Sequence, residues 1–433
     1  MDIEKRVTTE ERVFGYAVLA FSYVVLTAIS TYSLCGSESV AMKAGSLLFI
    51  ALAFAAILIT PDKARFRLPL GISKYFLIFT IATLIWTYFL YVYNMETQAI
   101  IVRGSQKLLF QLIVVVLACI PCMVFGEEAV RLTYYGMALC YVVNMGLCFM
   151  KFGPSESINS FIHFVTNEFD AVDFMKKMEV HDASFSFSLF LPYFLLWECE
   201  GEKRTKRNLF HIVSCLFFCF MAMKRIALAS NAIVIAVWFV GRKLKDKQIK
   251  TYLTLIGIGM MVMGVAYVIF TATGALSRFY SDNGINDMSR SEIYAIIRPY
   301  YELSPFYLGK GYEYITKLFE NLGKVGTLNL AHAKAMHNGY LTQYIEIGAP
   351  GFLFWMVYWM VFIPRHMMKY GGKAALAAGA LIFGSFITYL TDNTAFYFFT
   401  GTTLRLIIIC MAQKYNRKER RDTPYPMIQE AKS

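Results

Sequence analysis

Two groups of charged side chains in this sequence have types and spacing that could do chemistry. Lys224 and Arg225 are adjacent in a short turn between two apolar runs, where two positive charges favour an anion site. Arg290, Tyr294 and Arg298 are four residues apart, so a helix would place them on one face, with the arginines about 12 Å apart along its axis. The alternative for the first pair is a solvated turn whose side chains extend to lipid headgroups.

The elements that position these residues are membrane spans. Of 433 residues, 57% are hydrophobic and 17% are charged, against about 25% charged in an ordinary soluble domain. This composition excludes disordered, collagen-like and disulfide-scaffold proteins, and it predicts an all-α polytopic membrane protein with a single integral membrane domain over 1–433. We expect about twelve transmembrane helices, at 13–34, 40–60, 74–93, 107–125, 131–151, 183–198, 208–223, 226–241, 251–272, 342–363, 374–391 and 395–412.

The distribution of Lys and Arg predicts the orientation, because these residues collect in cytoplasmic loops. The segments 199–207 and 242–250 are rich in both, whereas the loops at 35–39 and 391–394 contain neither. We therefore expect both termini in the cytoplasm. The net charge of +12 then reflects topology, and no nucleic-acid partner is expected.

Two segments on the opposite side of the membrane are too long to be simple connectors. The first, 152–182, mixes charged residues with Phe and Met and predicts an extracytoplasmic amphipathic segment at the membrane surface. The second, 273–341, is a large extracytoplasmic loop, and loops of this size usually have a function. Within it the pattern predicts a helix over Ser289–Tyr301, stopped near Pro299 and Pro305.

Two further features lie inside predicted spans. An arginine within a membrane is costly and often functional, although Arg405 could also reach a carboxylate such as Asp392 or a headgroup. Cys119-Ile-Pro-Cys122 has the spacing of a redox motif, but it lies in an apolar run, where packing is the favoured role. The sequence contains no zinc-binding spacing and no phosphate-binding Gly-rich loop, so we expect no ATP hydrolysis on this chain and no cofactor for it.

A series of motifs runs from 224 to 354, in the order Lys224-Arg225-Ile-Ala-Leu-Ala, Ser289-Arg290-Ser-Glu292-Ile-Tyr294, Pro305-Phe-Tyr-Leu-Gly309-Lys-Gly311-Tyr312, His337-Asn338-Gly-Tyr340-Leu341 and Glu346-Ile-Gly348-Ala-Pro-Gly351. This series resembles the O-antigen polymerase and O-antigen ligase superfamily of bacterial cell-envelope enzymes. Two positions depart from the family pattern: Lys224 stands where the family often has Ser, and Pro350 interrupts the last Gly turn.

The resemblance implies a GT-C-like fold and a metal-independent inverting glycosyltransferase of the bacterial inner membrane, with its active site on the extracytoplasmic face. Donor and acceptor would be glycans carried on undecaprenyl pyrophosphate, which a polymerase would join into O-antigen, capsule or exopolysaccharide. A chain-length regulator is an expected partner. A ligase that transfers the finished glycan to an acceptor is the alternative within the family. A flippase for the same lipid is the alternative from another class, disfavoured because the two halves of the chain show no internal repeat.

The resemblance also implies roles for individual residues. Arg225 and Arg290 are expected to stabilise the charge of the pyrophosphate leaving group, and His337 is expected to act as the base or positioning partner of the acceptor hydroxyl. The alternatives are a surface position for Arg290 and a capping or packing role for His337. The residues expected to bind substrate are Arg298, Lys224, Tyr294, Asn338 and Tyr340.

Overall fold

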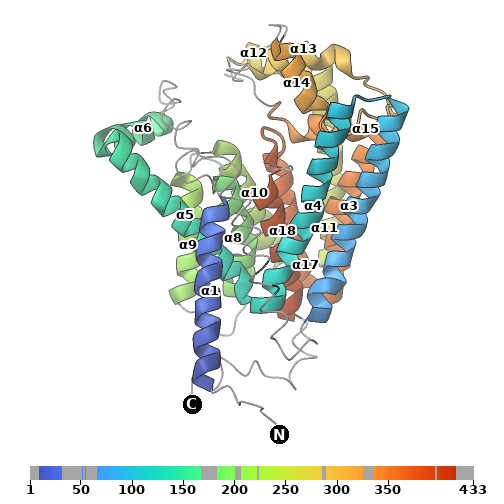
Figure 1. Ribbon diagram of the computed structural model, residues 1–433. Coiled ribbons are helices and arrows are strands. Elements are labelled where there is room, and N and C mark those ends of the chain that lie inside the picture. The colour runs from blue at the N-terminus through green and yellow to red at the C-terminus, as the bar shows by residue number, and fades with distance from the viewer. Residues whose placement is uncertain are drawn as a thin grey trace.

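The computed structural model describes residues 9–31, 51, 54, 66–166, 183–199, 206–221, 224–284, 289–324, 336–394 and 397–415, and every regular element in these ranges is helical (Figure 1). The α-helices are α1 (Thr9–Thr31), α3 (Arg67–Tyr93), α4 (Gln98–Phe125), α5 (Glu128–Phe152), α6 (Pro154–Thr166), α8 (Ala183–Cys199), α9 (Lys206–Met221), α10 (Arg225–Gly241), α11 (Asp246–Ala272), α12 (Ala275–Asp282), α13 (Arg290–Ile297), α14 (Tyr314–Lys324), α15 (Gly339–Val357), α16 (Ile363–Met367), α17 (Gly372–Thr388) and α18 (Phe398–Tyr415). The shorter helices are η5 (Arg298–Tyr300), η6 (Tyr358–Phe362) and η7 (Met368–Tyr370).

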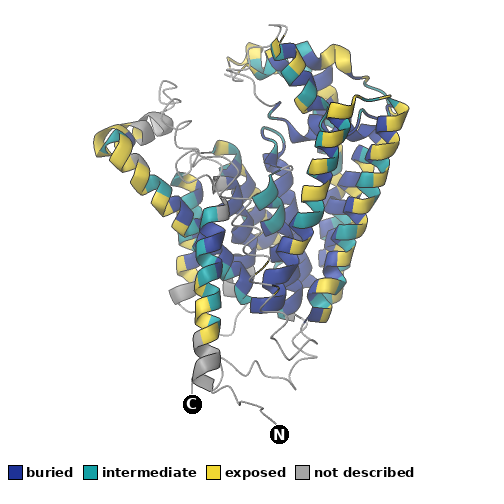
Figure 2. Cartoon of the chain, in the orientation of Figure 1, coloured by how far each residue is buried: buried dark blue, intermediate teal, exposed yellow. Residues whose placement is uncertain are grey.

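Helix α17 forms the centre of the bundle and is buried along nearly its whole length (Figure 2). It packs against α8, α10, α11 and α18. Its small residues allow this, because an added Cβ would lie 2.6 Å from Val234 at Gly384 and 2.7 Å from Leu253 at Gly379. Close packing through small residues is typical of helices that associate inside a membrane.

The outer faces of the bundle are apolar and exposed, as expected for a surface that faces lipid. On α3 the exposed side chains include Ile78, Ile85 and Val92, and the same pattern covers parts of α4 and α11 (Figure 2). Five described segments are long and apolar enough to cross a membrane: Arg67–Tyr93, Gln98–Phe125, Glu128–Phe152, Asp246–Ala272 and Gly339–Tyr370. Together with several shorter apolar helices, they make the chain a multi-pass membrane protein.

The predicted spans coincide with helices wherever the structure describes them. Eleven of the twelve expected ranges overlap a helix, and the range 40–60 lies outside the described residues apart from isolated positions. Helices α3 and α4 begin earlier than predicted, because α3 starts at Arg67 and α4 at Gln98. Twelve spans, and the orientation of the chain in the membrane, remain predictions.

Polar elements gather at one end of the bundle. Helices α12, α13 and α14 lie together above the end of α15 (Figure 1). Helix α11 has 27 residues, about 40 Å, so it separates the basic turn at 242–245 from α12 by roughly the thickness of a bilayer. The predicted helix over Ser289–Tyr301 is present as α13 and η5. Helix α6 covers the first part of the predicted segment 152–182, and 167–182 lies outside the described residues.

A break in α15 attaches this polar end to the membrane helices. Gly348 has φ 71° and ψ 177°, which interrupts the helix and leaves carbonyl groups for other partners. The backbone NH groups of Lys310 and Gly311 donate to the carbonyls of Ile345 and Glu346 at 3.0 and 2.7 Å. An added Cβ at Gly348 would lie 2.1 Å from the backbone of Leu308, so the contact requires glycine. Two motifs far apart in the sequence therefore form one backbone junction.

Candidate active site

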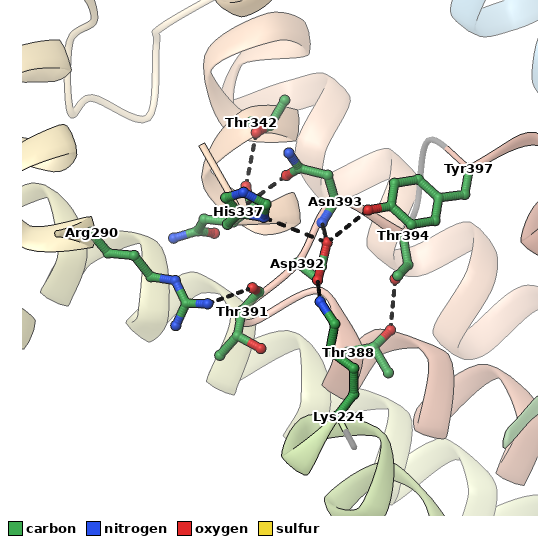
Figure 3. A network of polar contacts seen from close by, with 11 residues as sticks. Lys224, Arg290, His337, Thr342, Thr388, Thr391, Asp392, Asn393, Thr394 and Tyr397 are labelled. Carbon is green, nitrogen blue, oxygen red and sulfur yellow. Dashed lines mark hydrogen bonds and ion pairs between the residues drawn. The ribbon is translucent and has the colours of Figure 1, made fainter. Parts of the chain in front are cut away.

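Three elements converge on the connection between α17 and α18 (Figure 3). Lys224 comes from the start of α10, Arg290 from the start of α13, and His337 from the residues that lead into α15. All three approach the loop that contains Asp392, at the same end of the bundle as α13. The structure thus brings together three residues that are separated by up to 113 positions in the sequence.

Asp392 is the centre of this cluster, and its side chain is only 3% exposed. Its carboxylate accepts hydrogen bonds from Lys224 Nζ at 3.0 Å, the Asn393 backbone NH at 2.8 Å and the Tyr397 hydroxyl at 3.1 Å. Burial opposes ionisation of Asp392, but its contact with His337 and the charge of Lys224 outweigh burial, and its pKa lies well below the usual range for a carboxyl group. Asp392 is therefore a fixed negative charge.

His337 stands beside this charge and remains accessible. Its Nδ1 atom lies 3.7 Å from Asp392 Oδ1, and 43% of its side chain is exposed. The backbone of His337 has φ 48°, a conformation that costs a residue other than glycine about 1–3 kcal/mol. The following residues compensate, because Asn338 N donates to Asn393 Oδ1 and Gly339 N to the carbonyls of Tyr389 and Asp392. The imidazole therefore lies beside a carboxylate, and the hydrogen bonds of Asn338 and Gly339 stabilise the unusual backbone conformation of His337.

Asn338 organises this entry into α15 from a fully buried position. Its side-chain oxygen accepts the Leu341 NH at 2.9 Å and so caps α15 at its N-terminus. Its amide donates to the Tyr294 hydroxyl at 3.2 Å, which links α15 to α13. Burial raises the pKa of Tyr294 despite the hydrogen bond from Asn338, so this hydroxyl is neutral at physiological pH. Both residues, predicted to bind substrate, are placed where they position His337 and Arg290.

Tyr340 also lies away from any surface that a substrate could contact. Its ring is completely buried and makes edge contacts with Tyr267, Phe352, Trp355 and Phe386. In this structure Tyr340 packs between α11, α15 and α17, and the substrate contact expected from the sequence stays a prediction.

The two arginines of the external segment have different partners. Arg290 donates to the Thr391 carbonyl at 3.2 Å, next to Asp392, and its side chain is only partly buried (Figure 3). Arg298 donates to the carbonyls of Ala272 and Tyr301 at 2.9 and 3.0 Å, and its guanidinium lies 5.1 Å from the centre of the Tyr301 ring. Arg298 therefore fastens the end of α13 to the end of α11.

Lys224 and Arg225, the adjacent pair at the start of α10, also have different surroundings. Lys224 is paired with Asp392, so its charge is compensated within the protein. The alternative of a simple turn required a solvated charge instead. Arg225 is the first residue of α10, and its side chain is exposed.

Arg405, which the sequence allowed to reach Asp392, donates instead to the Gly401 carbonyl within α18. No three His, Cys, Asp or Glu side chains in the described part of the chain are close enough to hold a metal ion.

The sequence did not identify Asp392, Asn393 and Tyr397 as members of the site. A signal was present, because Thr391-Asp392-Asn393-Thr394 is a run of four polar residues in a short loop between two apolar spans. An acidic residue in such a position needs a partner, and here the partner is a lysine 168 positions earlier.

The arrangement can bind an anion and move a proton at one place. An imidazole beside a buried carboxylate is a pair that can orient and accept a proton from a hydroxyl group. The guanidinium of Arg290 lies on the adjoining residue, and arginine matches the oxygens of phosphate groups.

One region of the chain matches a known protein family. Residues 210–356, from α9 through most of α15, match a family model described as O-antigen ligase. No curated protein matches the chain. The matched region contains Lys224, Arg225, Arg290 and His337 and ends before Asp392. The match is consistent with the O-antigen polymerase and ligase superfamily, a family of surface polysaccharide synthesis whose members act on lipid-linked glycans.

Proposed function

We propose that this protein is a polymerase that joins undecaprenyl-pyrophosphate-linked repeat units into a surface polysaccharide. The proposal builds on the match of residues 210–356 to the family model described as O-antigen ligase. The observation that carries the proposal is His337, which is accessible and lies 3.7 Å from the buried carboxylate of Asp392, with Arg290 bound to the neighbouring residue. The reaction takes place at the extracytoplasmic face of the bacterial inner membrane, with both termini in the cytoplasm.

The reaction is a displacement at the anomeric carbon of the donor glycan. The acceptor hydroxyl attacks that carbon, the new glycosidic C–O bond forms, and the bond to the pyrophosphate oxygen breaks with inversion of configuration. His337 takes the hydroxyl proton, and the pyrophosphate leaves on its lipid carrier with the bonding electron pair. Asp392 supports His337, because an Nδ1–H group directed at the carboxylate leaves the other ring nitrogen able to accept the proton.

Charge grows on the leaving pyrophosphate during this step, and arginines are placed to stabilise it. Arg225 is exposed at the start of α10, and Arg290 has donors beyond the one bonded to Thr391. Stabilisation that increases in the transition state is the part that accelerates the reaction. Lys224 contributes indirectly, by compensating Asp392.

The same site would serve a ligase, which the description of the family model favours as the second candidate. Gel analysis of surface glycan from a deletion strain separates the two. Loss of a polymerase leaves single repeat units attached to the acceptor, whereas loss of a ligase leaves long chains on the carrier lipid. Complementation with His337→Ala is the matched control for a protein that reaches the membrane without activity.

A purified system separates both enzymes from a flippase. The protein is placed in liposomes with lipid-linked repeat units on the face that α12–α14 occupy, and chain length is followed by gel electrophoresis. Elongation on that face requires no transport across the bilayer. An absence of elongation together with movement of the lipid to the other leaflet would replace the enzyme with a transporter.

The orientation is tested in intact cells by single cysteines in a background without the native ones. A membrane-impermeant reagent should label a cysteine at the exposed Arg278 of α12 without lysis, and one at the exposed Lys243 only after lysis. The reverse order would place the candidate site in the cytoplasm and remove the proposed substrate.

A further inference from the structure

Arg405 is a positively charged residue buried inside a membrane helix. It is 7% exposed, its Nη1 atom donates to the Gly401 carbonyl at 2.9 Å, and its Nε atom has no hydrogen-bond partner. Its guanidinium carbon lies 5.3 Å from the centre of the Trp359 ring and 5.7 Å from that of Phe76. None of the ion pairs between described residues includes Arg405.

The guanidinium lines a cavity of about 60 Å³ between α3, α4, α15, α17 and α18. A cavity of this size has room for a small polar group. Part of the wall is aromatic, and its polar residues include Thr80, Thr83, Gln111, Gln343 and Thr400. Arg405 thus faces several side chains that can donate a hydrogen bond to one ligand.

The cavity lies directly beneath the candidate active site. Its wall includes Thr394, two residues after Asp392, and Gln343, which lies in the first turns of α15 after His337. Tyr312 lines it as well and donates to Gln343 Oε1 at 3.4 Å. The cavity and the candidate active site therefore share the segment 391–394.

A buried arginine without a carboxylate needs another source of negative charge. Aromatic rings attract the guanidinium more weakly than water does, and the Gly401 carbonyl satisfies only one of its five donors. Arginine presents a planar set of donors that fits the oxygens of phosphate groups, and intramembrane arginines usually have a function. A tetrahedral oxyanion is small, with five heavy atoms, and it needs several hydrogen-bond donors. The cavity offers a small space and several donors.

We propose that the Arg405 cavity binds a phosphate-type oxyanion, either the phosphate of a polyprenyl lipid or free phosphate. The inference goes beyond the reaction proposed above and does not depend on it, because it concerns binding alone.

The test is the thermal stability of the purified protein in detergent as the anion is added, since a ligand that binds only the folded state raises it. One arm uses inorganic phosphate with sodium chloride at equal ionic strength, and the other uses undecaprenyl phosphate in mixed micelles. We expect native protein to be stabilised in at least one arm and Arg405→Met to lose about 10- to 100-fold in apparent affinity. Arg278→Ala on α12 is the control for a lost exposed arginine and should leave the affinity unchanged.

The unliganded variant gives a second readout. Arg405→Met removes a buried charge that has no carboxylate partner, so it should be as stable as the native protein or more stable. Where this variant cannot be purified, Arg405→Lys and Gln343→Leu serve in its place and should each weaken binding. A response in both arms assigns a general phosphate site, and a response to the lipid alone assigns a carrier-lipid site.

The proposal is overturned if neither ligand stabilises the native protein, or if the Arg405 and Gln343 variants keep native affinity. Failure of chain elongation in liposomes would remove the proposed reaction and leave this result unaffected.

Discussion

Lys224 and Arg405 are both positive side chains withdrawn from water, and the protein compensates them differently. Lys224 is 24% exposed and donates to Asp392 at 3.0 Å, in a loop with further hydrogen bonds. Arg405 is 7% exposed, lies between two aromatic rings and forms no ion pair with a described residue. The charge of Lys224 is compensated by a carboxylate within a hydrogen-bond network, whereas the charge of Arg405 has no carboxylate partner among the described residues.

The magnitudes explain why this difference matters. Removing an ion from water costs several kcal/mol even after relaxation, whereas a cation–π contact contributes about 0.5–2 kcal/mol. Two aromatic contacts therefore do not offset the burial of Arg405 as a carboxylate offsets that of Lys224. The comparison indicates that Lys224 positions Asp392 and His337, and that Arg405 retains its charge for a ligand.

The largest effect is expected at the chemical centre of the network. His337→Ala should lower turnover by about 10²–10⁴ with little change in affinity for the lipid substrate, because a general base acts on the transition state. The measurement is in vitro elongation of a purified lipid-linked repeat unit, with His337→Gln as the matched variant that keeps a hydrogen-bonding side chain. Near-native rates for the alanine form would remove His337 from the mechanism.

The next effect concerns stability and separates the two charges directly. Lys224→Met leaves Asp392 buried without its cation and should lower the free energy of unfolding by about 3–5 kcal/mol, the cost typical of breaking a buried pair. Adding Asp392→Asn should recover much of this loss, since the two residues interact. Thermal unfolding in detergent measures both. Equal losses for Lys224→Met and Arg405→Met would contradict the contrast between a paired and an unpaired charge.

A smaller effect is expected from the arginines that face the leaving group. Arg290→Ala should reduce elongation about 10²-fold, the typical loss of one transition-state donor. Arg290→Lys should restore only part of the activity, because a point charge cannot replace a forked donor. Arg225→Ala should act similarly, and Arg278→Ala in α12 is the control. Native polymer length from the double alanine mutant of Arg225 and Arg290 would refute their assignment to the pyrophosphate.

The sequence predicted the elements better than their contacts. Apolar runs locate the helices, because burial in lipid requires about 20 consecutive apolar residues whatever the neighbours are. The motif around His337 was identified as functional, but its carboxylate partner Asp392 lies beyond the matched motifs, on the connection between the last two helices. Contacts between distant segments depend on how the helices pack, and the packing cannot be predicted from the apolar pattern of a single sequence.

Three of the residues expected to bind substrate are buried. Asn338, Tyr294 and Tyr340 are predicted to touch substrate because they accompany His337 and Arg290 in the motifs. The structure buries all three, and Asn338 links the start of α15 to Tyr294 of α13. A motif records which residues a site needs, and it does not separate those that contact substrate from those that support the strained backbone at His337.

The smallest effect concerns pH and follows from the lowered pKa of Asp392. An unfolded aspartate titrates near about 3.9, so the ionised carboxylate contributes its full stability above that value and loses it as the pH falls toward the folded pKa. The difference in melting temperature between native protein and Asp392→Asn should therefore not shrink as the pH falls from about 8 to about 5 and should shrink only below about pH 4. Melting curves across that range in detergent measure it. A difference that halves between pH 7 and pH 5.5 would mean that Asp392 takes up a proton near neutrality, and Lys224 would then be as poorly compensated as Arg405. A difference that does not shrink would assign any loss of activity in that interval to a group other than Asp392.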